Sequence, residues 1–110
     1  MATFQTHLPT IFGALADPTR LAVVERLVSG PASVSELAEP FDMAGPSFLK
    51  HLKVLEDAGM VASEKVGRVR TVRLAPDALG WVETWVRRHR RAWERRLDDL
   101  GTFLKEDNPS

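Results

Sequence analysis

Residues 33–59 read SVSELAEPFDMAGPSFLKHLKVLEDAG, and this stretch decides the fold. Ser33 and Glu36 stand three residues apart, which is the spacing of a capping box, where each side chain accepts from the other's backbone N–H. The pair predicts that a short helix begins here, with Leu37 facing inward. Pro40 limits this helix to about two turns.

A longer helix is predicted to follow a short connection. Gly45-Pro46-Ser47 supplies its start, and Gly59 supplies the residue that most easily adopts the left-handed conformation at a helix end. One face of this helix is apolar at i, i+4 and i+7 spacing: Phe48, Leu52 and Leu55, extended by Ala58. Polar and basic side chains lie off this stripe, near the start of the helix.

Two further helices precede this pair in the sequence. Apolar residues at three- and four-residue spacing predict the first over about Leu8–Ala16, with Pro9 tolerable only in its first turn. Asp17 and Pro18 predict the start of the second, because Asp supplies an acceptor for free backbone N–H groups and Pro needs no donor there. Gly30-Pro31 ends that helix.

After the longer helix, the pattern changes from helical spacing to β-prone runs. Residues 61–66 and 69–74 are rich in Val and Thr and are joined at Gly67-Arg68, which predicts a β-hairpin. Pro76-Asp77 then starts a helix that continues to about Leu104 and spans about 42 Å. A domain of this size does not need so long a helix for its own core. We therefore expect much of its apolar face to contact another subunit.

The predicted fold is mainly α-helical with a β-hairpin, in the order α-α-α-α-β-β-α. A short helix, a connection and a longer helix followed by a hairpin form the winged helix-turn-helix arrangement, in which the longer helix enters the major groove of DNA. The length of 110 residues predicts one domain over residues 1–110. We expect residues 8–75 to be the DNA-binding core, residues 77–104 a dimerisation helix and residues 105–110 a frayed tail.

The charge is unevenly distributed, although the formal net charge is zero. Residues 1–43 carry two basic and five acidic side chains, whereas residues 44–74 carry six basic and three acidic ones. The candidate anion-binding face therefore lies in the middle of the chain. The absence of cysteine excludes disulfides, thiolate metal sites and cysteine nucleophiles. Without a signal segment or a long apolar run, we expect a cytoplasmic protein with no membrane partner.

Candidate contacts with double-stranded DNA lie on the outward face of the longer helix and at the hairpin tip: Ser47, Leu49, Lys50, His51, Lys53, Arg68 and Arg70. Hydroxyl, imidazole and basic groups can reach base acceptors or phosphates, and Leu49 can contact a thymine methyl group. The two hairpin arginines suit the phosphate backbone or an adjacent minor groove. Each of these side chains could instead belong to an ordinary solvated surface.

Three segments resemble the ArsR/SmtB family of bacterial repressors: Ala16–Leu21 (ADPTRL), Ser35–Ala38 (SELA) and Lys50–Val61 (KHLKVLEDAGMV). The resemblance covers about residues 8–75. It implies a homodimer built from the first and last helices, which represses at an operator overlapping a promoter. The chain departs from its relatives at Ala44 and Gly45, where a polar cap and a glutamine are common, and at Leu49, where a serine is common. The operator sequence therefore does not carry over.

The implied dimer and the length of the last helix give the candidate interface residues: Leu8, Ile11, Phe12, Val82, Trp85, His89, Trp93 and Leu100. The ligands of the family's metal sensors are missing. Residues 36–40 read ELAEP without cysteine, and the last helix has a single histidine, His89. We therefore expect the metal-free branch of the family, with no metal site, no cofactor and an undefined effector.

Alternatives remain open at this stage. The domain could bind protein instead of DNA, or respond to a metal or to a small molecule held by tryptophans near the dimer seam. Residues 87–91 (RRHRR) could bind nucleic acid, although nearby Glu83 and Glu94 favour a solvated, salt-bridged face. An enzyme is not expected, because the sequence has no nucleophile with a paired base and no glycine-rich phosphate loop.

Overall fold

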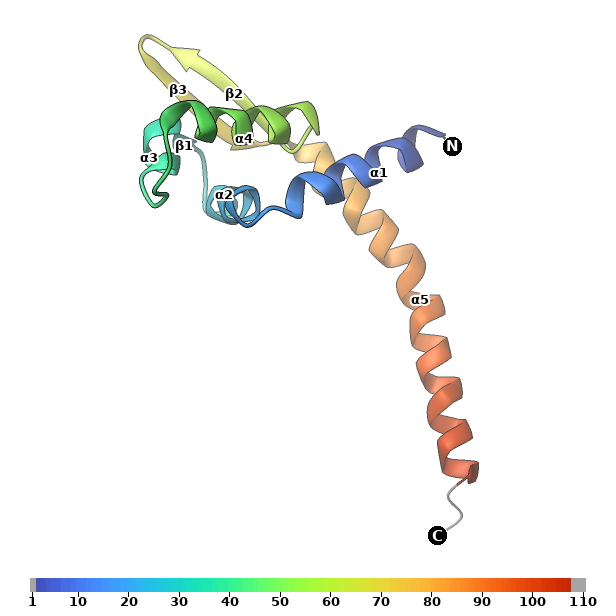
Figure 1. Cartoon of the computed structure of the whole chain (residues 1–110). Helices are drawn as coiled ribbons and strands as arrows, with labels where there is room; N and C mark the ends of the chain where they lie inside the picture. Colours follow the sequence, from blue (N-terminus) through green and yellow to red (C-terminus); the bar gives the residue numbers. More distant parts are fainter. Residues whose placement is uncertain (1, 108–110) are drawn as a thin grey trace.

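The computed structural model describes the backbone of residues 2–107 and the side chains of residues 8–77 and 79–104. The order is α1 (Ala2–Leu15), α2 (Pro18–Val28), β1 (Ala32–Ser33), α3 (Val34–Ala38), α4 (Gly45–Asp57), β2 (Val61–Val66), β3 (Val69–Leu74) and α5 (Pro76–Asp107). Helices α2 to α4 and the strands form one body, from which α5 extends (Figure 1), and the molecule measures 69 × 34 × 22 Å. The predicted mainly helical fold with a hairpin wing is confirmed.

Both predicted helix caps are formed. The carboxylate of Asp17 accepts a hydrogen bond from the backbone N–H of Arg20 at 3.0 Å, and Pro18 occupies the first turn of α2. At α3, the backbone N–H of Glu36 donates to Oγ of Ser33 at 3.1 Å, and the backbone N–H of Ser33 donates to the Glu36 carboxylate at 3.2 Å. These bonds satisfy donors that a helix start leaves without partners, so the local sequence sets where both helices begin.

Strand β1 corrects the predicted order, which becomes α-α-β-α-α-β-β-α. It pairs antiparallel with β3, with Ala32 opposite Val72 and Ser33 opposite Thr71, in a sheet of order β1-β3-β2. Two residues are too few to show the alternation that reveals a strand in a sequence. The pairing ties the start of α3 to the base of the wing.

The wing is the hairpin predicted from the sequence. Its strands pair from Val61 opposite Leu74 to Val66 opposite Val69. Gly67 has a φ of 62°, and a glycine with positive φ at the first of two turn positions is typical of a type II′ turn, which matches the twist of the flanking strands. Val61 is buried at the base, whereas Val66 is 67% exposed at the tip. The tip of the wing is therefore accessible to a binding partner.

The core lies where α4 packs on α1, α2 and the base of the sheet. The predicted α4 stripe is buried along its whole length: Phe48, Leu52, Leu55 and Ala58. The largest fully buried side chains contributed by the surrounding elements are Ile11, Val23, Met60 and Val72. Burial of this stripe fixes which face of α4 is left outside, because positions opposite it must face solvent.

Two helix boundaries differ from the prediction. Helix α1 begins at Ala2 instead of Leu8, so Pro9 lies inside it and not in its first turn. A proline costs about 3 kcal/mol inside a helix. The backbone hydrogen bonds of the helical turns before and after Pro9 offset this cost. Helix α5 reaches Asp107, so the expected tail is helical over 105–107; residues 108–110 lie outside the described residues.

Helix α5 is long but carries many charged residues. No helix within residues 2–107 combines the length and the apolar character that crossing a membrane requires.

Candidate nucleic-acid interface

The start of α4 presents an exposed face. Ser47, Leu49 and Lys50 are all exposed, and Leu49 keeps 52% of its surface. Ala44, at the N-cap, makes no side-chain hydrogen bond to the first turn. Among the described residues, the Lys50 ammonium has no hydrogen-bond or ion-pair partner. This turn therefore offers a free cation, a hydroxyl and backbone N–H groups, all of which suit an anionic partner.

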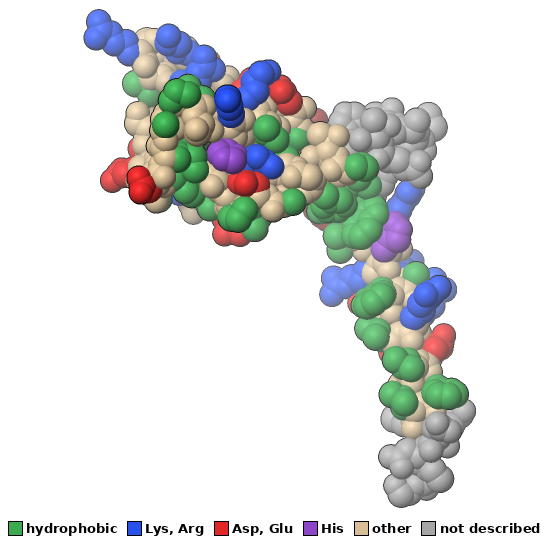
Figure 2. Space-filling view, viewed as in Figure 1, with side chains coloured by type: hydrophobic (Ala, Val, Ile, Leu, Met, Phe, Trp, Pro, Cys, Tyr) green, Lys and Arg blue, Asp and Glu red, His purple; other side chains and the backbone are tan. Residues whose placement is uncertain are grey.

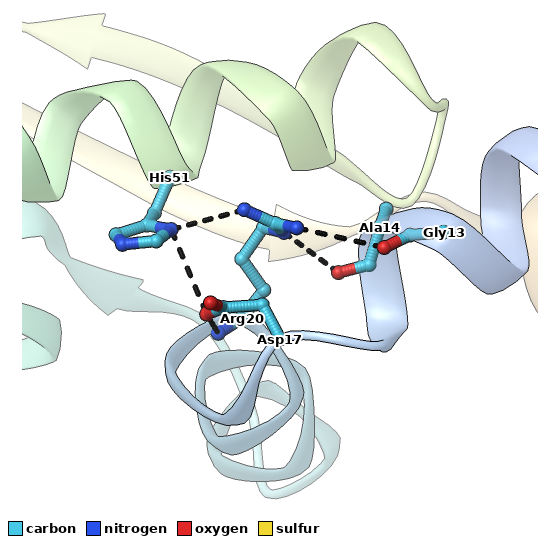
Figure 3. Close-up of polar contacts among 5 residues, drawn as sticks. All are labelled: Gly13, Ala14, Asp17, Arg20 and His51. Atoms are coloured by element: carbon cyan, nitrogen blue, oxygen red, sulfur yellow. Dashed lines mark hydrogen bonds and ion pairs between the residues drawn. The ribbon is translucent and has the colours of Figure 1, made fainter.

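His51 lies on a different side of α4 from Lys50. Its side chain is 24% exposed, and its Nδ1 lies 3.1 Å from Nη1 of Arg20 and 3.6 Å from Oδ2 of Asp17 (Figure 3). Arg20 also donates from Nε to the carbonyl oxygen of Ala14 at 2.7 Å and from Nη2 to that of Gly13 at 3.5 Å. The structure thus places one predicted DNA contact in a cluster that joins α4 to the start of α2 and the end of α1.

Two other predicted contacts have partners on the protein. Nζ of Lys53 donates to Oδ1 of Asp57 at 2.9 Å, and this bond raises the pKa of the Lys53 ammonium. Nη1 of Arg70 donates to Oγ of Ser63 at 2.9 Å. All these bonds are exposed, so they contribute little to stability and can be exchanged for bonds to phosphate.

The wing and α4 line a common groove of about 380 Å³ that also reaches the start of α3. It brings together residues of the β1–α3 segment, of α4 and of the hairpin: Ser33, Val34, Ser35, Leu49, Lys65, Arg68, Val69 and Arg70. Figure 2 shows Lys and Arg side chains gathered at the wing tip and over α4. Leu49 of the recognition helix therefore shares this groove with Arg68 and Arg70 of the wing, and Lys53 lies with Leu49 and Arg70 along a neighbouring groove.

Lys65 is a member of this groove that the sequence analysis missed. It stands directly opposite Arg70 in the hairpin register. Like charges in directly opposed strand positions repel, so this pair is more stable when an anion lies beside it. The predicted hairpin held the necessary signal, because its register places Lys65 next to Arg70. We call Ser47, Leu49, Lys50, Lys53, Lys65, Arg68 and Arg70 the α4–wing surface.

The predicted interface residues fall into two groups. Leu8 and Ile11 are 6% and 0% exposed, so a single chain already covers them. Phe12 remains 40% exposed and meets the edge of Trp85, with ring centroids 5.5 Å apart. Trp85 in turn stacks on His89 at 4.6 Å. An aromatic row therefore crosses from α1 to α5 on the surface of the chain.

The rest of α5 carries an exposed apolar stripe, visible in Figure 2 as hydrophobic side chains spaced along the helix. Val82 is half-buried at its start. Further along, Trp93 is 65% and Leu100 52% exposed, and the same stripe holds Val86, Leu97, Phe103 and Leu104. A groove of about 620 Å³ runs over Trp85, His89 and Trp93. We call Val86, Trp93, Leu97, Leu100, Phe103 and Leu104 the α5 stripe.

The basic run over residues 87–91 is engaged with acidic neighbours one turn away. Arg87 pairs with Glu83, and Nε of Arg90 lies 3.0 Å from the Glu94 carboxylate. These pairs fit the salt-bridged interpretation of this face. Across the described part of the chain, no three His, Asp or Glu side chains gather in a way that could hold a metal ion.

Comparisons with known proteins agree with this geometry. A family of helix-turn-helix domains matches residues 15–64, from the end of α1 into β2. The HTH-type transcriptional regulator Rv2034 of Mycobacterium tuberculosis (strain ATCC 25618 / H37Rv) is 42% identical over 94 residues, which cover 86% of this chain and 85% of that protein.

Solved structures share the fold. The crystal structure of an ArsR family transcriptional regulator is 52% identical, with a TM-score of 0.76 over 82% of this chain and 93% of its own. The homodimeric winged helix-turn-helix DNA-binding domain Mb0332 from Mycobacterium bovis, a possible ArsR-family regulator, has a TM-score of 0.64 at 22% identity and covers 83% of this chain and 86% of its own. The chain therefore belongs to the ArsR/SmtB family and is a DNA-binding transcriptional regulator.

Proposed function

We propose that this regulator is a repressor that binds a palindromic operator as a homodimer. The observation that carries the proposal is the α4–wing surface, in which Leu49 of α4 and the basic hairpin tip line one groove, while Ser47 and Lys50, close to Leu49 on the same helix, are exposed. Among the described residues, Lys50 has no acidic partner, and Lys65 and Arg70 stand opposite each other in the hairpin. An anion bound at this surface would reduce the repulsion between these positive charges.

Each part of the surface has a separate role in this proposal. Ser47 and Lys50 face base edges from the major groove, and Leu49 offers apolar contact to a thymine methyl group. Lys53 exchanges Asp57 for a phosphate. Arg68 and Arg70 hold the backbone or an adjacent minor groove, which positions the protein but carries less sequence information.

A second copy of the chain is the proposed occupant of the α5 stripe. Trp93, 65% exposed in one chain, is an unusually large apolar side chain to leave in water. The homodimeric M. bovis domain has the same fold, which supports this arrangement. Because Leu8 and Ile11 are covered within the chain, we assign α1's share of the interface to Phe12. Two-fold symmetry would place two copies of α4 about one helical turn of DNA apart, hence the palindrome.

We further propose that the regulator works in the cytoplasm and requires no transition metal. The sequence contains no cysteine, and His51 and His89 lie in different helices. Among the described residues, no three His, Asp or Glu side chains gather around one point, as a transition-metal site requires. Operator affinity should therefore be the same with a chelator and with added zinc. A change of more than about tenfold between the two conditions would instead favour a metal-responsive repressor.

Selection of genomic DNA fragments with purified protein at two salt concentrations tests the main proposal. We expect a short palindrome upstream of few genes, bound more weakly at high salt because basic side chains displace counterions. The double variant Lys50→Ala/Arg68→Ala should lose the selection, whereas Arg95→Ala, on the side of α5 opposite Trp93, should retain it. Recovery of fragments that share no sequence would overturn the proposal. The protein would then need a co-ligand to bind DNA specifically, or its winged-helix domain would bind protein instead of DNA.

A further inference from the structure

His51, which the sequence predicted to face DNA from the recognition helix, contacts other parts of the protein instead. Its Nδ1 faces two residues from the start of α2, Arg20 at 3.1 Å and Asp17 at 3.6 Å (Figure 3). Arg20 and His51 are 31 positions apart in sequence, so this contact is a product of the fold. We call Asp17, Arg20 and His51 the polar clamp.

Arg20 joins a third element to the clamp. Its Nε and Nη2 donate to the carbonyl oxygens of Ala14 and Gly13, in the last turn of α1. Carbonyl groups at a helix end have no partner within the helix, so a guanidinium placed there satisfies them and complements the helix dipole. One side chain thus holds the end of α1, the start of α2 and the middle of α4 in a single geometry.

A hydrogen bond from Arg20 to His51 requires one particular tautomer of the histidine ring. A guanidinium has five N–H donors and no acceptor. The contact between Nη1 of Arg20 and Nδ1 of His51 is therefore a hydrogen bond only when Nδ1 accepts, which places the ring proton on Nε2. The Asp17 carboxylate is occupied by the backbone N–H of Arg20, which lowers its pKa, and it stays charged beside the guanidinium.

We propose that His51 is a positioning residue, which sets the angle of the recognition helix through the polar clamp instead of contacting DNA bases. The proposal rests on the DNA-binding function. Phe12, next to Gly13 in α1, packs on Trp85 of α5. The polar clamp therefore connects α1 and α5, the helices proposed to form the dimer, with α4, the helix proposed to contact the operator. A small tilt of α4 in each subunit would displace the contacts with both half-sites.

Three substitutions of His51 separate the two roles. His51→Asn keeps an acceptor near the position of Nδ1 but lacks Nε2. His51→Gln places its terminal amide near Nε2 and lacks an acceptor at Nδ1, and His51→Phe keeps only the ring shape. Arg20→Lys keeps the charge without the forked donors. Arg26→Lys is its matched control on α2, because exposed Arg26 donates to the Gly30 carbonyl at 3.1 Å and to no other group among the described residues.

The measurement is the dissociation constant of each variant for the duplex that wild-type protein selects and for a scrambled duplex, with a thermal melt of each protein. We expect Phe and Gln at position 51, and Arg20→Lys, to weaken specific binding by about tenfold, as for a lost bond to a charged group. Binding to the scrambled duplex should not change, and Asn should restore specific binding. If Gln restored binding and Asn did not, His51 would be a DNA contact, and wild-type affinity in every variant would also overturn the proposal.

A measurement on the free protein keeps this test separate from the DNA-binding proposal. Nitrogen-15 spectra of the imidazole should show the Nε2–H tautomer for His51 in the wild type and in Arg26→Lys, and a tautomer mixture in Arg20→Lys. An Nδ1–H ring in the wild type would exclude the clamp, whatever the DNA results. Failure of wild-type protein to prefer any duplex, with the expected spectra, would overturn the proposed function and with it a role for the clamp in operator binding.

Discussion

The backbone N–H of Met60 donates to the carbonyl oxygen of Leu55 at 2.9 Å, and both side chains are fully buried. Between them, the N–H of Gly59 donates to the carbonyl of Glu56 at 3.0 Å, and Gly59 has a φ of 76°. This pair of bonds is a Schellman motif with its usual apolar contact. Because β2 begins at Val61, the motif fixes the wing directly to the end of the recognition helix.

Gly59→Ala should lower the free energy of unfolding by about 1–2 kcal/mol, the cost of a left-handed residue with a Cβ. The added Cβ would meet nothing within 4 Å, so the effect comes from the backbone alone. Urea unfolding followed by circular dichroism measures it. Gly80→Ala, inside α5 with equally open surroundings, should instead stabilise by up to about 1 kcal/mol. Equal effects of the two variants would contradict the role given to the motif.

Arg68→Ala should weaken operator binding and reduce its salt dependence. Arg68 is exposed at the wing tip and has no partner among the described side chains. Loss of one phosphate contact lowers the slope of log affinity against log salt by about 1 for each subunit. Fluorescence anisotropy at several salt concentrations gives this slope. Arg95→Ala is the control, and an unchanged slope for Arg68→Ala would show that the wing does not contact DNA phosphates.

Trp93→Glu should dissociate the proposed dimer without unfolding the chain, because Trp93 is 65% exposed in a single chain. Burial of a charge in place of a large aromatic side chain should cost about 2 kcal/mol or more of association free energy. Sedimentation equilibrium measures the change. Arg95→Glu, on the opposite side of α5, should leave the dimer intact. Dimers of unchanged affinity in Trp93→Glu would place the interface elsewhere.

The two helix-capping carboxylates predict sensitivity to acid. Hydrogen bonds from backbone N–H groups lower the pKa of Asp17 and of Glu36. A carboxyl group with a lower pKa in the folded state stabilises the fold above its unfolded pKa, and this contribution disappears as the pH falls through the folded pKa. The free energy of unfolding should therefore decline below about pH 5.

The double variant Asp17→Asn/Glu36→Gln tests this origin. Both replacements keep an oxygen acceptor for the caps but cannot titrate, so the decline should become shallower. Urea unfolding between pH 7 and about pH 3 covers the range over which these carboxyl groups titrate. A decline as steep as that of the wild type would assign the acid sensitivity to other groups.

Local signals in the sequence predicted a large part of the fold. The caps at Asp17 and Ser33, the α4 stripe around Phe48 and the turn at Gly67 each act within a few residues of the chain. They therefore leave a readable pattern whatever surrounds them. The resemblance to a known family added the overall arrangement, which the matches over residues 15–64 and beyond confirm.

Features that depend on distant segments were not predictable in this way. The partners of His51 lie at the start of α2, more than 30 positions earlier in the chain, so nothing near His51 in the sequence distinguishes it from a DNA contact. Apolar spacing likewise could not separate Ile11, which the chain buries, from Phe12, which it leaves 40% exposed. Strand β1 exists because α2 brings it beside β3, and two residues cannot announce that pairing.

Strand β1 is only two residues long, and its length affects the solubility of the protein. It covers β3 only at Thr71 and Val72, so the outer part of the hairpin presents backbone groups that another strand could pair with. Edge strands with this exposure tend to join their counterparts in other molecules unless charges prevent it. Lys65, Arg68 and Arg70 occupy that part of the wing. The cations proposed to hold phosphate therefore also repel the wings of other protein molecules and oppose edge-to-edge strand pairing between molecules that are not bound to DNA. Neutralising all three should therefore cause aggregation as well as loss of DNA binding.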